Sequence, residues 1–467
     1  MKHSIILFFT FFVATTSACL GQYTVLHNFN GADGATPNGT LLLSKNLLYG
    51  MTRNGGIHGD GTIFSIDTNG NSYRKLHDFD SLNGCHPYGS VVLAGNTIYG
   101  MTLYGGKSNR GIIFSMDSSG SSFKVLLNFN DTNGACPWGS LLFLNNKLYG
   151  MVERGGTYNG GRLFSIDTNG SGFSDIFDFY IPGALPTGSL IVSGKYFYGM
   201  TWGLGIVGNI FSIDTNGNNY KDLHDFQGEL YNDGSAPYGD LTLFGKKLFG
   251  MTSLGGFANW GTVFSIDTDG SEYKILINNG GHQNGASPYG NLTLMNNRLY
   301  GMTYADGIHY GGDIFSIDTN AGEYVDLYEF NSPTGSSPWG NLTSLGNLLY
   351  SMTTMGGTYG DGVIFKIDTG ANVTGINELT QNSDAVKLFP NPSNGKFTIE
   401  VKSEELKTKG KVEVFNMLGQ EVYATPINPP IQADFDLNMS SQPSGIYFYR
   451  VMTETGSLVG EGKFIIQ

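Results

Sequence analysis

The chain has 467 residues, a net charge of −13 and 69 glycines, and only 14% of its residues are charged. Its negative charge opposes contact with phosphate groups, so the composition argues against nucleic acid or an anionic membrane as a partner. Abundant glycine with 13% aromatic residues favours many short strands joined by tight turns, and no stretch shows the period of a long helix.

A secretory signal peptide is predicted at residues 1–21. Lys2 supplies its positive charge, residues 5–13 its apolar core, and Ser17 and Ala18 the small residues near the cleavage point. This apolar run is too short to span a bilayer. No second hydrophobic stretch follows it, so we expect the mature chain to have no transmembrane segment.

Residues 22–370 consist of one sequence pattern that occurs seven times. A Tyr-Gly-Met-Thr element is followed by a glycine-rich loop and then by a Phe-Ser-Ile-Asp-Thr-Asn-Gly element, with small variations. The methionine of the pattern lies at Met51, Met101, Met151, Met200, Met251, Met302 and Met352. A period of about 50 residues indicates an array of repeated supersecondary units.

One repeat reads as four short strands. In the first repeat we predict strands at residues 40–43, 47–52, 62–67 and 73–79, the last two joined by an Asn-Gly hairpin turn. The strands are apolar on both faces, so we expect each sheet to be covered on both sides. Gly50, in the middle of the second strand, indicates a close approach from a neighbouring sheet. Four antiparallel strands per repeat predict one blade of a β-propeller.

The two ends of the array complement each other. Residues 23–29 read as a fourth strand without a preceding third strand, and the seventh repeat ends at residue 370 without a fourth strand. Pairing residues 23–29 with residues 365–368 would leave no exposed sheet edge. The sequence therefore predicts an all-β fold, a seven-bladed propeller closed by its N-terminal strand.

The long loops are predicted to share one face of this propeller, because they lead into the first and third strands of each blade. Each loop between blades ends in Pro-X-Gly, and the residue X is aromatic in five of the seven repeats: Tyr88, Trp138, Tyr238, Tyr289 and Trp339. Two interpretations stay open. The rings surround the mouth of the central channel and stack on a ligand such as a sugar, or they wedge between blades and serve packing.

Other candidate sites are few. Cys85 and Cys136 occupy the same loop in adjacent repeats, and either a disulfide or two unpaired buried thiols fits this placement. No twelve-residue calcium loop and no metal-ligand spacing occurs, so no metal or cofactor is predicted. No pair of carboxylates confined to one blade points to acid-base catalysis, so no catalytic residue is assigned.

The repeat, with its Tyr-Gly-Met-Thr, Gly-Gly and Phe-Ser-Ile-Asp-Thr-Asn-Gly elements, resembles the GloVer tandem repeats of secreted bacterial proteins over residues 23–370. This resemblance implies an extracytoplasmic location and a varied C-terminal anchor. It brings no catalytic residues to transfer.

Residues 386–467 resemble the type A C-terminal sorting domain of the type IX secretion system, after a linker at residues 371–385. The matching positions include Pro390, Asn391, Pro392, Gly395, Gly419, Gly445, Tyr447 and Lys463. The resemblance implies a small Ig-like β-sandwich that directs the chain across the outer membrane, with the type IX machinery as its partner. It also implies a secreted or cell-surface protein.

Three functions remain in view. A secreted module that binds a glycan or another polymer through the long-loop face is favoured, because the sevenfold pattern lacks the asymmetry that catalysis needs. The alternatives are a polysaccharide lyase or hydrolase built on a propeller, and a structural component of an extracellular matrix.

We expect export to remove both ends of the chain. Mass spectrometry of secreted material should show a first residue between Cys19 and Tyr23 and a last residue near 371–390. Cytoplasmic protein that keeps the intact C-terminal domain, with none secreted, would contradict this expectation.

Overall fold

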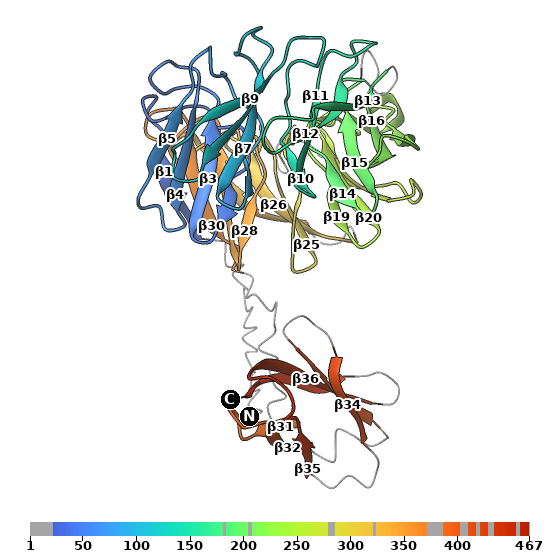
Figure 1. Cartoon of the computed structure of the whole chain (residues 1–467). Coiled ribbons are helices and arrows are strands. Elements are labelled where there is room, and N and C mark those ends of the chain that lie inside the picture. The colour runs from blue at the N-terminus through green and yellow to red at the C-terminus, as the bar shows by residue number, and fades with distance from the viewer. Residues whose placement is uncertain are drawn as a thin grey trace, which may run out of the picture. The chain divides into compact units, whose positions relative to one another are not determined.

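The structure, a computed structural model, describes residues 22–180, 184–203, 208–278, 285–320, 324–370, 386–401, 410–416, 421–427, 434–453 and 458–466. The predicted signal peptide and the predicted linker lie outside these residues. The chain divides into two compact units, Met1–Gly370 and Ala371–Gln467 (Figure 1). The described residues are strands, turns and loops apart from two short 3-10 turns, η1 (Glu229–Tyr231) and η2 (Ser332–Thr334). The prediction of an all-β chain is confirmed.

Within the described part of the first unit, seven antiparallel sheets have four strands each. The first strands are β2 (Leu42–Ser44), β6 (Val92–Ala94), β10 (Leu142–Leu144), β14 (Ile191–Ser193), β19 (Thr242–Phe244), β24 (Thr293–Met295) and β28 (Thr343–Leu345). The second strands are β3 (Leu47–Thr52), β7 (Thr97–Thr102), β11 (Lys147–Val152), β15 (Tyr196–Thr201), β20 (Lys247–Thr252), β25 (Arg298–Met302) and β29 (Leu348–Thr353). The third strands are β4 (Thr62–Asp67), β8 (Ile112–Asp117), β12 (Arg162–Asp167), β16 (Asn209–Asp214), β22 (Thr262–Asp267), β26 (Asp313–Asp318) and β30 (Val363–Asp368). The fourth strands are β5 (Arg74–Asp78), β9 (Lys124–Asn128), β13 (Ser174–Asp178), β17 (Lys221–Asp225), β23 (Lys274–Asn278), β27 (Val325–Glu329) and β1 (Gln22–Asn28).

The sheet of the seventh repeat contains strands from both ends of the repeat array, in the order β1-β30-β29-β28. Strand β1 runs antiparallel to β30, with Tyr23 opposite Ile367 and Val25 opposite Phe365. The register shifts by one residue between Val25 and His27. A strand from the start of the chain thus occupies the fourth position that the last repeat leaves open.

The hydrophobic core lies between consecutive sheets. In the first sheet, Tyr49 and Met51 pack against residues of the second sheet such as Ile98 and Phe114. Leu48, on the opposite face of the same strand, shares a cluster with Tyr350 of the last sheet. Because successive side chains of a strand point to opposite faces, each sheet is buried on both sides. This agrees with strands that are apolar on both faces.

The glycine in the second strand serves its own sheet. A Cβ atom at Gly50 would lie 2.5 Å from Cζ of Phe64, which sits directly opposite on β4, and 3.0 Å from Cδ2 of Leu41 of the same repeat. The prediction that a neighbouring sheet approaches Gly50 is therefore wrong. The missing side chain makes room for the Phe64 ring, which covers the bare backbone of the adjacent strand.

The glycines of the seven Pro-X-Gly segments lie so close together that no side chain fits between them. A Cβ atom on each would come within 2.0 to 2.5 Å of the carbonyl oxygen of the same glycine in the next repeat, as Gly39 does with Gly89. The series is Gly39, Gly89, Gly139, Gly188, Gly239, Gly290 and Gly340. Gly340 approaches Gly39 in the same way, so these contacts return to the first repeat. The first strand, predicted at residues 40–43, is observed at Leu42–Ser44. Before it, the backbone N–H of Thr40 donates to Ser90 of the second repeat, and the carbonyl of Leu41 accepts a hydrogen bond from Thr343 of the seventh.

The second unit contains two sheets in its described residues. β31 (Val386–Phe389), β32 (Lys396–Val401) and β35 (Asp434–Asn438) form one sheet. The other has the order β34 (Glu421–Ile427), β33 (Gly410–Phe415), β36 (Gly445–Thr453) and β37 (Leu458–Ile466). Phe397 and Ile399 of the first sheet share one hydrophobic cluster with Val412, Val414 and Phe464 of the second. Two sheets packed on a common core form a sandwich.

We expect Gly239→Ala to destabilise the protein by about 3 kcal/mol or more, because the new methyl group would stand 2.0 Å from the carbonyl oxygen of Gly290. Gly245→Ala is the matched control. Gly245 has a φ of +61°, and a Cβ atom there meets nothing within 4 Å, so the cost should be only about 1 kcal/mol. Thermal and urea unfolding of both variants compare the two effects, and equal losses would refute the steric argument.

Candidate functional site

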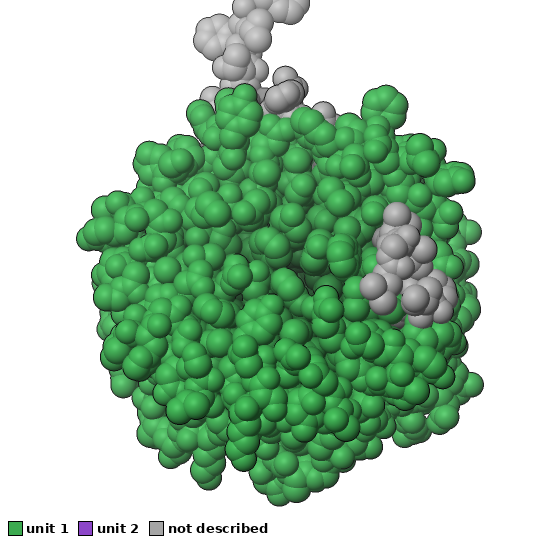
Figure 2. Space-filling view, turned by 90° about the horizontal axis from the view of Figure 1, so that it is seen from above, with its two compact units in different colours: residues 1–370 green, residues 371–467 purple. Residues whose placement is uncertain are grey.

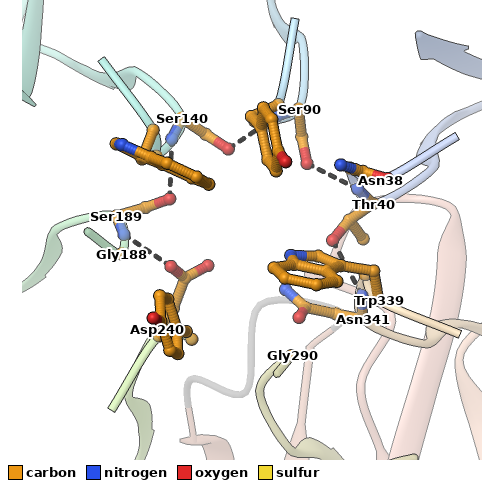
Figure 3. Close-up of a pocket in the computed structure, with 18 of the residues that line it drawn as sticks. Asn38, Thr40, Ser90, Ser140, Gly188, Ser189, Asp240, Gly290, Trp339 and Asn341 are labelled. Atoms are coloured by element: carbon orange, nitrogen blue, oxygen red, sulfur yellow. Dashed lines mark hydrogen bonds between the residues drawn. The ribbon is translucent and has the colours of Figure 1, made fainter. Parts of the chain in front are cut away.

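The five predicted aromatic residues line one cavity in the first unit, together with the equivalent Asn38 and Thr187 of the other two repeats. Each repeat supplies the residue X of Pro-X-Gly and the glycine after it. The cavity has a volume of about 60 Å³ (Figure 3). One water needs roughly 10–15 Å³ by this measure, so the space holds a few waters or one small chemical group.

The aromatic rings contact one another around the cavity. Tyr289 and Trp339 are stacked, with ring centroids 4.0 Å apart and an interplanar angle of 3°. Tyr88 lies 4.3 Å from Trp138 and 6.1 Å from Trp339. Tyr238 lies 5.3 Å from Tyr289 and 6.3 Å from Trp339. Contacts between rings of non-adjacent repeats show that these side chains gather at one place, and all five are half-buried.

Tyr88 and Trp138 also pack behind the cavity. Both contact a small buried cluster of Leu103, Ala135 and Cys136. The indole Nε1 of Trp138 donates a hydrogen bond of 2.5 Å to Oε2 of Glu153. These two rings therefore combine the two functions considered for this position, lining the cavity and filling space between repeats.

A belt of hydrogen bonds runs beneath the aromatic rings and joins neighbouring repeats. In each, the backbone N–H of the residue after the Pro-X-Gly glycine donates to the side chain at the same position of the next repeat. Five of the bonds are drawn in Figure 3: Thr40 to Ser90 (2.7 Å), Ser90 to Ser140 (2.8 Å), Ser140 to Ser189 (2.8 Å), Ser189 to Asp240 (2.5 Å) and Asn341 to Thr40 (3.0 Å). A sixth joins Asn291 to Asn341 (2.6 Å). We call this series the hydrogen-bond belt.

Asp240 is the one acidic or basic side chain among the residues that line the cavity. Burial raises the pKa of its carboxyl group above the usual value. Its hydrogen-bond partners are neutral, the amide N–H of Ser189 and the side chain of Asn341. Sequence reasoning did not single out Asp240. The available signal was a carboxylate at a repeat position that otherwise holds serine, threonine or asparagine.

Cys85 and Cys136 are free thiols and both are buried. Burial raises the pKa of Cys85 to about 11 and also raises the pKa of Cys136. Thiols of this kind stay protonated at neutral pH and are weak nucleophiles.

Two groups of three potential metal ligands occur among the described residues, each with donor atoms within 4.8 Å of one another. The first is Asp60, Cys85 and His86. Its members have other partners, since Asp60 accepts a hydrogen bond from Ser81 and Nδ1 of His86 lies 3.0 Å from the carbonyl oxygen of Arg53. The second group is Asp313, Asp326 and Glu329.

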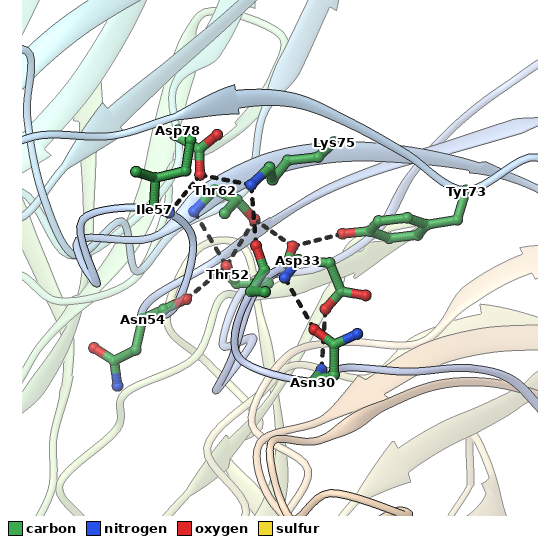
Figure 4. Close-up of polar contacts among 10 residues, drawn as sticks. Asn30, Asp33, Thr52, Asn54, Ile57, Thr62, Tyr73, Lys75 and Asp78 are labelled. Atoms are coloured by element: carbon green, nitrogen blue, oxygen red, sulfur yellow. Dashed lines mark hydrogen bonds and ion pairs between the residues drawn. The ribbon is translucent and has the colours of Figure 1, made fainter.

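This acidic group stands at a repeat position whose charge differs between sheets. In the first repeat, Nζ of Lys75 lies 2.9 Å from Oδ1 of Asp78, which also accepts a hydrogen bond from the backbone of Ile57 (Figure 4). In the third repeat, the guanidinium group of Arg162 pairs with Asp175 at 2.5 Å and with Asp178 at 2.8 Å.

The sixth repeat has Asp313, Asp326 and Glu329 at the positions of Arg162, Asp175 and Asp178, so three carboxyl groups meet where the third repeat has a cation between two. Asp313 accepts hydrogen bonds from the hydroxyl groups of Thr303 and Tyr324. Burial, together with the Asp326 carboxylate, raises the pKa values of both Asp313 and Glu329 to about 7.

The residues of the predicted sorting motif lie mainly at the start and the end of the second unit. Asn391 accepts a hydrogen bond of 3.0 Å from the backbone of Ile465 and donates one of 3.1 Å to the carbonyl of Lys463, between Pro390 and Pro392. These bonds attach the start of the unit to its last strand.

Other motif residues support the sandwich from within. The hydroxyl of Tyr447 donates a hydrogen bond of 2.8 Å to the carbonyl of Pro443. Gly395 has a φ of +91°, and Gly445 opens β36. Gly419 lies outside the described residues.

Comparison with protein families gives two matches. Residues 10–209 and 202–388 match the family described as Gloeobacter/Verrucomicrobia repeat. Residues 387–467 match the family described as secretion system C-terminal sorting domain. The sorting domain marks proteins that the type IX secretion system exports to the cell surface or the extracellular space. The predicted resemblances and the predicted location are confirmed. Among the described residues, no helix has the length and apolar character needed to cross a membrane.

Solved structures with a similar fold have distant sequences. A puromycin hydrolase is 12% identical with a TM-score of 0.51, over 79% of this chain and 59% of that one. PorZ, a surface component of the type IX secretion system of Porphyromonas gingivalis, is 14% identical with a TM-score of 0.45, over 95% and 60%. An oligogalacturonate lyase in complex with manganese is 12% identical with a TM-score of 0.47, over 76% and 94%. No curated protein matches the sequence. At sequence identities this low, the comparison concerns the fold and not the function of these proteins.

We expect the acidic group of the sixth repeat to make stability depend on pH. Free Asp and Glu have pKa values near 4, so between about pH 4 and pH 7 the folded state binds protons that the unfolded state does not. The free energy of unfolding should therefore fall as the pH rises through this window. Glu329→Gln should stabilise the protein at pH 8 by about 1 kcal/mol, a modest gain because Glu329 is partly exposed.

The gain from Glu329→Gln should shrink towards pH 4, measured by thermal unfolding across this range. Asp178→Asn is the matched control, because it removes a partner of Arg162 and should destabilise the protein at neutral pH. The same sign of change in both variants would contradict the charge argument.

Proposed function

Because this chain belongs to the Gloeobacter/Verrucomicrobia repeat family and ends in a type IX sorting domain, we propose that residues 22–370 form a binding module of the cell surface or extracellular space. In this proposal the module is a closed seven-bladed β-propeller. Its long-loop face binds an extracellular glycan or another polymer, and the aromatic cavity lies at the centre of the binding surface.

Three observations support the closed propeller. The described residues 22–370 contain seven four-stranded sheets, one for each repeat. The sheet of the seventh repeat includes the N-terminal strand β1. The hydrogen-bond belt passes from Asn341 of the last repeat to Thr40 of the first, and Gly340 approaches Gly39. A propeller closed in this way leaves only short, protected sheet edges.

The single observation that carries the binding role is the gathering of five half-buried aromatic side chains around one cavity. Rings of this kind offer stacking area to sugars and other flat or apolar groups, and they are already held in place by their neighbours. Because these side chains are already ordered, a ligand that stacks on them would bind with only a small entropy cost for fixing the protein.

The surrounding loops extend this surface. In each repeat the two long loops lie side by side, as in the bridge between Ala35 and Asn54. The loops between the second and third strands carry large exposed side chains: Ile57, Tyr158, Phe257, Ile308 and Tyr359. Figure 2 shows the face of the first unit on which these loops lie, with a hollow near its centre. Exposed apolar side chains around a hollow are typical of surfaces that bind partners.

The enzyme alternative has less support. A polysaccharide hydrolase or lyase needs at least two groups that exchange protons with the substrate. The lining of the cavity offers one carboxylate, Asp240, and its other ionisable groups are the phenols of Tyr88, Tyr238 and Tyr289, whose pKa values burial raises.

We expect Trp138→Ala and Trp339→Ala each to weaken polymer binding about tenfold, since a stacked ring contributes on the order of 1 kcal/mol. A glycan array probed with residues 22–467 would first identify the ligand, and binding isotherms would then compare the variants. Phe244→Ala is the control, because Phe244 is an exposed aromatic residue at the end of the first strand β19 and does not line the cavity.

Thermal unfolding of the same variants separates binding from packing. If the two tryptophans serve packing alone, each substitution should cost about 3–5 kcal/mol of stability and binding by the folded fraction should not change. That result would overturn the proposed binding role.

A further inference from the structure

Asp240 breaks the chemistry of the hydrogen-bond belt without changing its geometry. Its Oδ1 accepts the backbone N–H of Ser189, as Ser90 Oγ accepts that of Thr40 and Asn341 Oδ1 that of Asn291. A hydroxyl or a neutral amide therefore fulfils the structural role of this position. The negative charge of Asp240 adds nothing that the belt requires.

Ionisation of the Asp240 carboxyl group is unfavourable at this place. The Asp240 side chain is half-buried and lines the cavity, and this burial disfavours its ionised form. Its partners, the Ser189 amide and the Asn341 side chain, are neutral and do not compensate it. A carboxyl group that lines a cavity, has no cationic partner there and has its pKa shifted by burial marks a candidate binding site.

The residues above Asp240 suit a cation. Tyr88, Trp138, Tyr238, Tyr289 and Trp339 line the same cavity, and the faces of Trp and Tyr rings attract positive charge through their quadrupole. One of these rings already contacts a protein cation, since the guanidinium carbon of Arg53, which does not line the cavity, lies 4.7 Å from the centroid of the Tyr88 ring. Aromatic rings with one carboxylate are the combination that recognises organic ammonium groups.

We propose that the cavity binds an organic cation, an alkylammonium or trimethylammonium group, whose charge faces the Asp240 carboxylate and whose carbon atoms contact the aromatic rings. This inference rests on the proposed function, because it specifies the chemistry at the centre of the same binding face. The cavity volume of about 60 Å³ agrees with a compact headgroup and is small for a whole sugar ring. The bound polymer or metabolite therefore carries a substituted amine.

The test compares two ligands of the same shape and different charge. Choline and its neutral isostere 3,3-dimethyl-1-butanol are titrated into residues 22–467, with the fluorescence of the tryptophans and calorimetry as readouts. We expect choline to bind at least tenfold more tightly than the isostere. Asp240→Asn should reduce choline affinity about tenfold and leave affinity for the isostere unchanged.

Asp240→Asn is expected to fold normally, because asparagine stands at the same belt position in Asn291 and Asn341, and Oδ1 of Asn341 accepts the same kind of hydrogen bond. An unchanged melting temperature confirms this. Equal affinity for choline and its isostere overturns the inference. So does undiminished choline binding by Asp240→Asn.

The outcome also separates this inference from the proposed function. If choline fails to bind while the polymer still depends on Trp138 and Trp339, the cation chemistry is wrong and the binding module stands. If polymer binding is also independent of the two tryptophans, both proposals fall.

Discussion

The close approach of seven glycine residues is the constraint on which the first unit depends. Each glycine places its α-carbon against the carbonyl of the next, at a spacing that no other residue tolerates. This spacing brings the following residue within hydrogen-bond distance of its counterpart and produces the belt. It also sets the width of the cavity, because the aromatic residue before each glycine is held at a fixed distance from the rest. The proline before the aromatic residue packs on the neighbouring repeat, as Pro87 does beside Gly61.

A scaffold fixed by backbone contacts leaves individual side chains free to differ between repeats. One hydrogen bond is retained although the residue that accepts it differs: the bond to the last residue of the fourth strand. Asp78, Asn28 and Glu329 each accept a hydrogen bond from the backbone of a glycine-rich loop, although one of the three is neutral. The residue beside that acceptor changes from a cation in the third repeat to a carboxyl group in the sixth. The repeats therefore share one backbone and differ in single side chains. Asp240 is the side chain of this kind that lines the cavity.

The sequence allowed much of the fold to be predicted, because a period of about 50 residues and strands apolar on both faces constrain the sheets strongly. The complementary ends of the array predicted which strands pair, since residues 23–29 lacked a third strand and the seventh repeat lacked a fourth. Positions that depend on distance in space were less accessible. The role of Gly50 was misassigned because the sequence does not show that the ring of Phe64 lies across it. Asp240 was not singled out, although it is the one carboxylate at a repeat position that otherwise holds serine, threonine or asparagine. Its significance depends on the hydrogen-bond belt and the cavity, which the sequence does not show. The aromatic residues were recognised as a set, but their mutual contacts depend on the narrowness that the glycines impose.

The sheet that joins the two ends of the array affects the order in which the protein acquires its structure. Strand β1 finds its partner β30 only after more than 300 intervening residues have been made. At a synthesis rate of roughly 5–20 residues per second, this strand waits on the order of twenty seconds to a minute. During that time the first sheet lacks the neighbour that the seventh repeat supplies, and the contact between them carries the entropy cost of a very long loop. Strand β1 of a nascent chain of this design therefore stays without its partner until the last repeat has been made.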